Sequence, residues 1–374
     1  MNTQKTSWFE KNPKKTIAFV LVAIFILFSM LDFSLYKLFA RGCIWTYSPY
    51  YHHGKIKNFT QKEDWADGKK EIKYIDHTNS LGFKDSKIRK VALKSNKYRI
   101  LFIGDSFTEG VGYPYDLTFV GLFEKMLDKD RFEVLNAAAI SYSPKLYYLK
   151  IKYLIENVGL KFDELFVFID ISDIYDELDY KEFSPITNTF HLFFTKSHIL
   201  LAQKSYTFNK ISLLWYNAKY RITEKFLLFI EKIKHNKNNS TKTEAETPPA
   251  RSSWIVDKKE FDSWGREGLS LADKHMELLF ELCKKHNIKM NIAVYPWPEQ
   301  IANKDLNSIQ VKHWEDFAKK RHIGFIDYFP YFINNADPKS VITDKFIPDD
   351  VHWSEKGHRL IADILYKYWN GRRI

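Results

Sequence analysis

The sequence contains very little cysteine. Only Cys43 and Cys283 occur in 374 residues, one near an N-terminal apolar segment and the other in a predicted helix. Two cysteines placed in this way form no disulfide framework, and no cluster of Cys and His residues has the spacing of metal ligands. The sequence therefore excludes a disulfide-stapled scaffold and a Cys/His metal site, and it leaves the redox compartment open.

The chain also lacks a dense basic stripe, although its formal net charge is +11. The lysines are spread along predicted helices and loops, whereas a nucleic-acid interface would concentrate them and interleave them with aromatic residues. A lysine-rich, solvated surface is therefore favoured, and no nucleic-acid partner is expected. Attraction to anionic envelope polymers or lipid headgroups is compatible with this charge. Hydrophobic residues make up 45% of the chain, so most of it should fold.

One run of the chain is long and continuously apolar. Residues 16–39 follow a polar, basic tail of residues 1–15, and a helix over this run would be roughly 36 Å long, enough to span a bilayer. Because lysine-rich flanks stay in the cytoplasm, we expect an uncleaved single-pass anchor in the inner (cytoplasmic) membrane, with the rest of the chain on the periplasmic side. A cleaved signal peptide is the alternative, but Arg41 interrupts the small-residue site at 40–42.

After the anchor the chain changes character. Residues 40–97 are mixed and polar with aromatic interruptions, and we interpret them as a stem. Beyond them, short apolar runs alternate with helical patterns over 98–182 and 254–374, which predicts an α/β domain with a parallel sheet and helices on both faces. The five predicted strands are the apolar runs at residues 100–103, 132–135, 165–169, 290–295 and 324–328.

The alternation of strands and helices is interrupted by residues 183–253. The first part is rich in aromatic and aliphatic residues at helical spacing, and residues 234–253 are polar, with the composition of a flexible linker. We interpret the whole range as a helical insertion that ends in a loose loop. Its aromatic stripes are expected to pack in the protein, with a membrane-facing role as the alternative.

The stretch from Arg99 to Gly112, RILFIGDSFTEGVG, carries the first chemical signal. An apolar run that a glycine ends is typical of a buried strand. The residues just past such a strand lie at its carboxyl end, where open α/β sheets bind their ligands. Ser106 should therefore project from a tight turn at the mouth of a site, with Asp105 beside it on the substrate side.

A serine is a weak nucleophile unless a base takes its proton and a third group orients that base. The C-terminal part of the chain offers both. Asp349 and His352 are three residues apart, so the carboxylate can reach the imidazole and fix its orientation. His352 would then receive the Ser106 proton. Asp350 is an alternative to Asp349 for the orienting role, or a helix N-cap.

Ester chemistry also needs donors for the developing oxyanion. The candidates are the backbone N–H of Ser106, a backbone N–H near Ser141 and the side chain of Ser172. Trp297 and Tyr295 follow the fourth predicted strand and are candidates for lining the pocket, with packing as the alternative. His358 lies on the last predicted helix, and we expect a structural role for it.

The Gly104-Asp105-Ser106 turn after the first strand, combined with Asp349-x-x-His352 near the C-terminus, resembles the SGNH (GDSL-type) hydrolase superfamily over 98–182 and 254–374. This resemblance implies a three-layer αβα sandwich around a five-stranded parallel sheet. It also implies Ser106 as nucleophile, His352 as base and Asp349 as its orienting partner, with no metal or organic cofactor.

The chain departs from the pattern of this superfamily at two places. Ser141 stands where the family usually has a glycine whose N–H helps to form the oxyanion hole, which costs little because only the backbone donor is required. Asp170-Ile171-Ser172-Asp173 stands where the family usually has Gly-x-Asn-Asp, so a serine replaces the asparagine that donates the third hydrogen bond. Losing one such donor costs ~3 kcal/mol of transition-state stabilisation.

An N-terminal anchor with an extracytoplasmic SGNH-type domain is similar to bacterial envelope enzymes that add or remove O-acetyl groups on polysaccharides. The resemblance therefore implies an ester hydrolase or O-acetyltransferase that acts on a cell-envelope glycan through an acyl-serine intermediate. A catalytically silent module that binds glycans or scaffolds an envelope assembly complex is the alternative. A lipid esterase is a third hypothesis, motivated by the aromatic insertion near a membrane.

Overall fold

The computed structural model describes residues 7–39, 44–66, 71–212, 214, 251–333 and 337–371. Most of the polar loop predicted at 234–253 lies outside the described residues. The chain divides into two compact units. One comprises Met1–Cys43 and Thr187–Ala245, and the other comprises Ile44–Ile186 and Glu246–Ile374.

The larger unit is built around a mixed sheet. Its strands, in chain order, are β3 (Thr60–Ala66), β4 (Glu71–Thr78), β5 (Lys84–Asp85), β6 (Tyr98–Ile103), β7 (Phe132–Asn136), β8 (Glu164–Ile169), β9 (Lys289–Val294) and β10 (Gly324–Asp327). Their spatial order is β10-β9-β8-β6-β7-β5-β4-β3. A separate antiparallel hairpin consists of β1 (Trp45–Ser48) and β2 (His52–Lys55).

The five strands β10, β9, β8, β6 and β7 are mutually parallel, which confirms the predicted α/β core. β8 is buried along its whole length, and its apolar run at 165–169 suits the middle of a doubly covered sheet. Phe102 of β6 stacks on Phe166 of β8 with ring centroids 5.3 Å apart. This aromatic layer anchors the centre of the sheet.

Three antiparallel strands extend the sheet beyond the five that were expected. β3 pairs with β4, β4 with β5, and β5 with β7 through Lys84 and Asn136. All three come from the range that we interpreted as a stem. β3 is an edge strand of sequence TQKEDWA, which lacks the alternation of apolar and polar residues that would reveal a half-buried strand.

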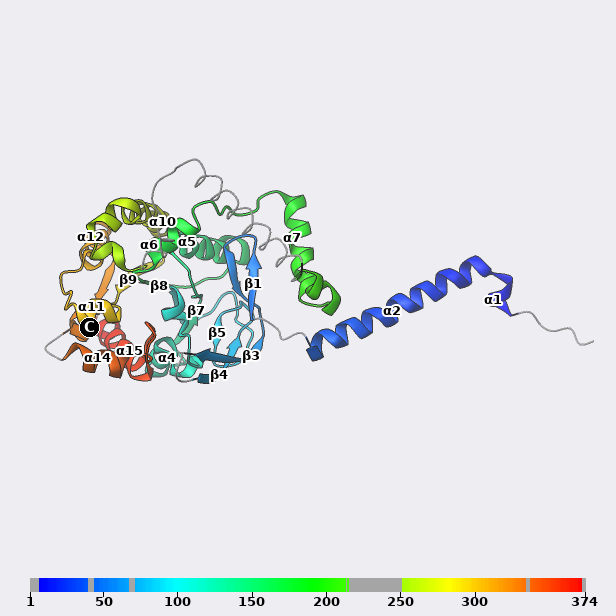
Figure 1. Ribbon diagram of the computed structural model, residues 1–374, viewed down its shortest axis with the longest axis horizontal. Coiled ribbons are helices and arrows are strands. Elements are labelled where there is room, and N and C mark those ends of the chain that lie inside the picture. The colour runs from blue at the N-terminus through cyan, green and yellow to red at the C-terminus, as the bar shows by residue number, and fades with distance from the viewer. Residues whose placement is uncertain are drawn as a thin grey trace, which may run out of the picture. The chain divides into compact units, whose positions relative to one another are not determined.

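Helices cover both faces of the sheet. In chain order they are α3 (Ser106–Glu109), η1 (Tyr115–Leu117), α4 (Phe119–Met126), α5 (Pro144–Lys152), η2 (Tyr153–Val158), α6 (Asp173–Asp179), η3 (Ser253–Ile255), α9 (Lys258–Glu260), η4 (Phe261–Gly265), α10 (Arg266–Lys285), α11 (Pro298–Ala302), α12 (Ile309–Arg321), α13 (Phe329–Ile333), α14 (Pro338–Lys345) and α15 (Glu355–Gly371). α10 packs against α5 and α6 on one side, and α15 packs against α4 on the other (Figure 1).

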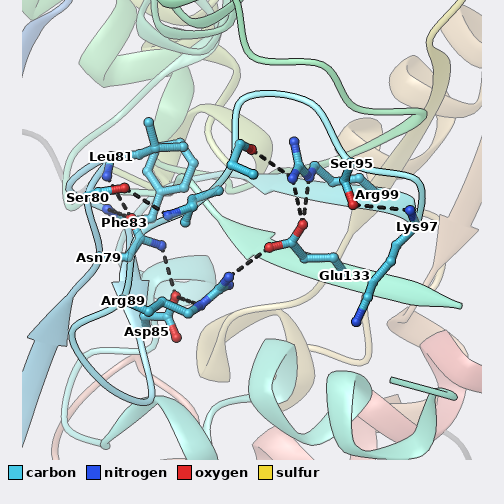
Figure 2. Close-up of polar contacts among 12 residues, drawn as sticks. Asn79, Ser80, Leu81, Phe83, Asp85, Arg89, Ser95, Lys97, Arg99 and Glu133 are labelled. Carbon is cyan, nitrogen blue, oxygen red and sulfur yellow. Dashed lines mark hydrogen bonds and ion pairs between the residues drawn. The ribbon is translucent and has the colours of Figure 1, made fainter. Parts of the chain in front are cut away.

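A polar network fixes the segment that leads into β6 (Figure 2). Glu133 of β7 accepts hydrogen bonds from Arg99 and Arg89, at 2.6 and 2.7 Å. Arg89 also contacts Asp85 at 2.7 Å, and Asn79 donates to the same carboxylate at 2.9 Å. Arg99 is only 1% exposed, so its charge depends on these partners. The network joins residues 79–89 to the parallel core.

The smaller unit contains α1 (Trp8–Lys11), α2 (Pro13–Phe39) and α7 (Thr189–Ala202). Among the described residues, α2 is the one helix that is long and apolar enough to cross a membrane. Its Asp32 carboxylate accepts hydrogen bonds from the backbone N–H and the hydroxyl of Thr207, at 2.8 and 2.7 Å. α7 lies in the predicted insertion, and residues 206–212 of the same range are also helical.

Candidate functional site

Ser106 lies where β6 ends and α3 begins. Asp105 caps α3, because its side chain accepts a hydrogen bond from the Phe107 N–H at 3.0 Å. The turn requires a glycine at 104, since a Cβ there would lie 2.2 Å from the Thr108 hydroxyl oxygen. The tight turn predicted from the sequence therefore exists, and it leaves Ser106 partly exposed at the carboxyl edge of the sheet.

His352 lies between Ser106 and a carboxylate. Its Nε2 is 2.8 Å from Ser106 Oγ, and its Nδ1 is 2.6 Å from Asp350 Oδ1. A carboxylate only accepts hydrogen bonds, so Nδ1 carries a proton in this arrangement and Nε2 of the neutral ring is free to accept from the serine hydroxyl. Two residues predicted to act together, Ser106 and His352, are thus brought into contact.

The carboxylate that orients the ring is that of Asp350, and not that of Asp349 as expected. Asp349 adopts a left-handed backbone conformation, with φ of 59°. The chain therefore turns at this position instead of continuing as a helix, and the next carboxylate reaches the imidazole. Asp350 Oδ1 also accepts the backbone N–H of His352 at 3.0 Å, which closes the turn.

The environment of Asp350 keeps it ionised. Burial alone would raise the pKa of this carboxyl group, but hydrogen bonding and ion pairing with His352, together with a hydrogen bond from Trp65, outweigh burial and lower the pKa to about 2. A permanently charged Asp350 can stabilise an imidazolium form of His352 during a reaction.

Ser172 does not present its hydroxyl to the site as the sequence suggested. The hydroxyl donates to Asp170 Oδ2 at 2.5 Å, and the Ser172 N–H donates to the same oxygen at 3.0 Å. The other oxygen of Asp170 accepts from the indole Nε1–H of Trp297 at 2.6 Å. Trp297, a candidate for substrate binding, is therefore a partner of Asp170 and holds it beside the site.

Asp105, Asp170 and Asp173 form a buried acidic group, with carboxylate oxygens within 4.8 Å of one another. Burial, followed by the charges of the neighbouring carboxylates, raises the pKa of Asp105 and of Asp173 well above the usual range. Tyr147 donates to Asp173 at 2.7 Å, and Tyr295 donates to Asp105 at 3.3 Å. Burial and the closeness of the three carboxyl groups therefore favour their protonated forms.

Ser141 lies in the loop after β7, with a left-handed φ of 53°. The loop is held against α3, because the Ile140 N–H donates to Glu109 Oε2 at 2.9 Å and the Ala139 N–H donates to the Gly104 carbonyl at 3.3 Å. The structure thus brings this loop beside the nucleophile turn. The role of the Ser141 N–H as an oxyanion donor stays a prediction.

Two further candidates, Tyr295 and His358, are buried in the protein interior. Tyr295 is fully buried, and its ring packs against Phe107 and Trp353 at 5.0 and 4.7 Å. His358 is also buried, and its Nδ1 accepts the Phe119 N–H at 3.2 Å, while burial lowers its pKa to about 3. A neutral, bonded His358 has the structural role that we expected for it.

One residue of the site was missed from the sequence. Trp65 of β3 donates its indole Nε1–H to Asp350 Oδ2 at 2.7 Å. Its ring stands edge-on to His352, with centroids 5.3 Å apart. The two partners are separated from Trp65 by more than 280 residues of chain. No periodicity or motif around residue 65 signals this contact.

No family model and no curated protein matches the sequence. Three solved structures are similar over most of their length. A psychrotrophic esterase from Pseudoalteromonas sp. is 10% identical, with coverage of 74% of this chain and 98% of the other and a TM-score of 0.39. A GDSL-like lipase from Bacteroides thetaiotaomicron is 10% identical, with coverage of 75% and 93% and a TM-score of 0.38. A Geobacillus acetyl-xylooligosaccharide esterase is 13% identical, with coverage of 74% and 96% and a TM-score of 0.40.

Proposed function

We propose that this protein is an SGNH-type serine ester hydrolase that works through an acyl-serine intermediate. The observation that carries this proposal is the chain of contacts from Ser106 Oγ through His352 to Asp350, with distances of 2.8 and 2.6 Å. A nucleophile, a base and an orienting carboxylate in hydrogen-bond contact are the arrangement that activates a serine.

The geometry supports a two-step reaction. Ser106 Oγ attacks the ester carbonyl carbon while its proton moves to His352 Nε2, and Asp350 stabilises the imidazolium that forms. The imidazolium then gives its proton to the departing alkoxide, which leaves as an alcohol. Water repeats the sequence in the second step, breaks the acyl-serine bond and releases the acid. A sugar hydroxyl in place of water would make the same site an O-acyltransferase.

The oxyanion of the intermediate needs donors other than Ser172, whose hydroxyl is held by Asp170. The backbone N–H of Ser106 and the loop around Ser141 are the available donors at the ends of β6 and β7. With two donors in place of three, transition-state stabilisation is weaker by ~3 kcal/mol, so we expect modest turnover.

We further propose that the substrate is an O-acetylated cell-envelope glycan and that the enzyme is anchored in the inner membrane. α2 supports the anchor by its length and apolar composition, and residues 1–15 carry four lysines, Lys5, Lys11, Lys14 and Lys15. The positive-inside rule then leaves the larger unit on the periplasmic side. No cofactor or metal enters the proposed reaction.

A catalytically silent glycan-binding or scaffold module of an envelope assembly complex is the second candidate. The hydrogen bond between Ser172 and Asp170 favours it, because that bond removes the third oxyanion donor. The contact of Ser106 with His352 opposes it, since a silent module has no need of an activated serine.

The experiment compares the full chain in detergent with its S106A variant on p-nitrophenyl acetate. S263A is a matched control, because Ser263 is an exposed serine whose hydroxyl donates to the Glu260 carbonyl at 3.1 Å, and neither residue belongs to the proposed site. We expect turnover in the wild type and S263A and background rates in S106A. Equal rates for all three would exclude the serine mechanism. Oligosaccharide acceptors then separate release of acetate from transfer to sugar.

A further inference from the structure

We infer that Trp65 is a positioning residue of the site. A residue of the antiparallel extension then orients site residues that belong to the parallel core. This inference rests on the proposed function, because Trp65 acts through Asp350 and His352. Trp65 lies on β3, the outermost strand of the antiparallel extension.

The hydrogen bonds of Asp350 divide between its two oxygens. Oδ1 accepts from the Nδ1–H and the backbone N–H of His352, whereas Oδ2 accepts from Trp65 Nε1–H at 2.7 Å. A carboxylate turns easily about its terminal torsion, because that torsion has a broad energy profile. The indole donor therefore fixes the plane of the carboxylate and keeps Oδ1 directed at the imidazole.

Trp65 also restricts the imidazole ring itself. Its ring meets His352 at an interplanar angle of 86°, and the Phe107 ring lies 4.7 Å from the same imidazole. Phe107 belongs to α3, directly after the nucleophile. The imidazole is therefore held by one aromatic ring from the core and one from the N-terminal extension.

A second contact, made by β2, supports the part of the site that is expected to hold the oxyanion. Lys55 of β2 pairs with Glu109 of α3 at 2.5 Å, and both side chains are almost fully buried. The other oxygen of Glu109 accepts the Ile140 N–H, which fixes the loop expected to supply an oxyanion donor. Lys55 is itself held by Asp76 of β4. The range 44–85 therefore supports both the base and the oxyanion side.

The test is the W65F variant of the full chain, with W264F as its matched control. Trp264 also donates its indole N–H to a carboxylate, Glu260, which takes no part in the proposed site. Phenylalanine keeps an aromatic ring and removes the donor. We expect W65F to lose about tenfold in kcat with KM within twofold of wild type, and W264F to keep wild-type constants.

A second readout does not depend on turnover. A hydrogen-bonded imidazole Nδ1–H gives a proton NMR signal far downfield, and the H352A variant assigns it. We expect W65F to weaken this signal through faster exchange with water, while W264F retains it. A kcat within twofold of wild type, or an unchanged signal in W65F, would overturn the inference. Absence of esterase activity from the wild type would instead contradict the proposed function, and the NMR comparison would still decide the role of Trp65.

We also propose that α7 lies in the lipid bilayer beside α2, an inference that rests on the proposed anchor. The large apolar side chains of α7 are exposed, with Phe190 at 71% and Phe193 at 65%, and the helix also carries polar residues such as Lys196 and His198. Phe194, Leu200 and Leu201 are exposed as well. Exposed apolar side chains gathered on one helix mark a surface that meets protein or lipid.

The contact between Asp32 and Thr207 favours lipid as the surrounding of α7. Asp32 lies seven residues before the end of α2, which is roughly 10 Å along the helix. If α2 spans the bilayer, Thr207 lies at the same depth, inside the apolar layer. A carboxylate at that depth needs partners, and both donors of Thr207 supply them. The segment after α7 therefore enters the membrane with α2.

The test places the environment-sensitive fluorophore NBD on α7 of the full chain in lipid nanodiscs. Cys43 and Cys283 are replaced by alanine, and one cysteine is introduced by F193C or, as a control on α10, by L278C, a position that is 40% exposed. Circular dichroism checks that both variants fold. We expect lipids brominated on their acyl chains to quench the probe at 193 and not at 278. A probe at 193 that brominated lipids leave unquenched, whether it lies in water or against protein, would overturn the proposal.

Discussion

Asp350 Oδ1 accepts both the Nδ1–H and the backbone N–H of His352, at 2.6 and 3.0 Å. One oxygen therefore closes the backbone turn and orients the imidazole. The neighbouring Asp349 supplies the left-handed residue of that turn, with φ of 59°. The two adjacent carboxylates thus have different tasks, and substitution separates them.

Replacing Asp350 by asparagine should damage catalysis far more than replacing Asp349. D350N removes the charge that stabilises the imidazolium and offers an amide that favours the wrong tautomer, so we expect kcat to fall by ~10⁴-fold. D349N preserves a residue that tolerates the left-handed region, and its kcat should stay within threefold of wild type. Steady-state hydrolysis of p-nitrophenyl acetate by both variants measures the difference. A larger loss in D349N would restore the expectation drawn from the sequence.

Removing the Ser172 hydroxyl should cost less than removing an oxyanion donor. The hydroxyl donates to Asp170, so S172A removes no hydrogen bond to the oxyanion of the proposed intermediate. We expect kcat to fall less than tenfold, compared with the ~10²–10³-fold loss typical of an oxyanion-hole donor. A loss of hundredfold or more in S172A would show that the hydroxyl turns toward the substrate.

The buried Lys150 should make stability depend on pH. Burial lowers its pKa from 10.5 to about 7. Between these values the unfolded chain holds a proton that the folded chain lacks, so the free energy of unfolding rises as pH rises from 7 to 10.5. Below pH 7 the folded protein buries the charge, and the Tyr51 ring 3.9 Å from Nζ offsets part of that cost.

We therefore expect the K150M variant to be more stable than wild type by about 2–4 kcal/mol at pH 6, a difference that shrinks as the pH approaches 10.5. Urea unfolding at a series of pH values measures it. The half-buried Lys152 on the same helix provides a control, because the pH dependence of stability in K152M should follow that of wild type. An equal pH dependence in K150M and wild type would contradict this account.

Truncating Glu133 should destabilise the larger unit. Glu133 bridges Arg89 and the buried Arg99, as Figure 2 shows. E133A leaves the Arg99 charge without its carboxylate, so we expect a loss of about 3 kcal/mol in the free energy of unfolding. D130A removes an exposed carboxylate from the preceding turn and should change it by less than about 0.5 kcal/mol. Similar midpoints for the two variants in urea would refute the role given to this network.

The parallel core could be predicted because each of its strands is an apolar run that ends before polar residues. Ser106 and His352 could be paired because Ser106 lies just beyond a strand that the pattern reveals and His352 just before the last predicted helix. The choice between Asp349 and Asp350 could not be made, because it depends on one left-handed residue in a turn. A spacing of three residues suits either a helix or this turn.

The antiparallel extension and Trp65 could not be predicted. β3 is a polar edge strand whose pairing partners, and not its own sequence pattern, determine its place in the sheet. The contact of Trp65 with Asp350 joins two parts of the chain that only tertiary folding brings together. The hydrogen bond from Ser172 to Asp170 escaped prediction for a different reason, because a serine hydroxyl has several acceptors within reach and its choice depends on local geometry.

The most direct measurement of the central claim is covalent labelling of the full chain with diethyl p-nitrophenyl phosphate, followed by peptide mass spectrometry. An activated serine attacks phosphorus and expels p-nitrophenolate, which leaves a diethylphosphoryl group on its oxygen. We predict one such group on the peptide that contains Ser106, formed in wild type and lost in H352Q. An unlabelled Ser106 in wild type, or equal labelling in H352Q, would contradict activation of Ser106 by His352.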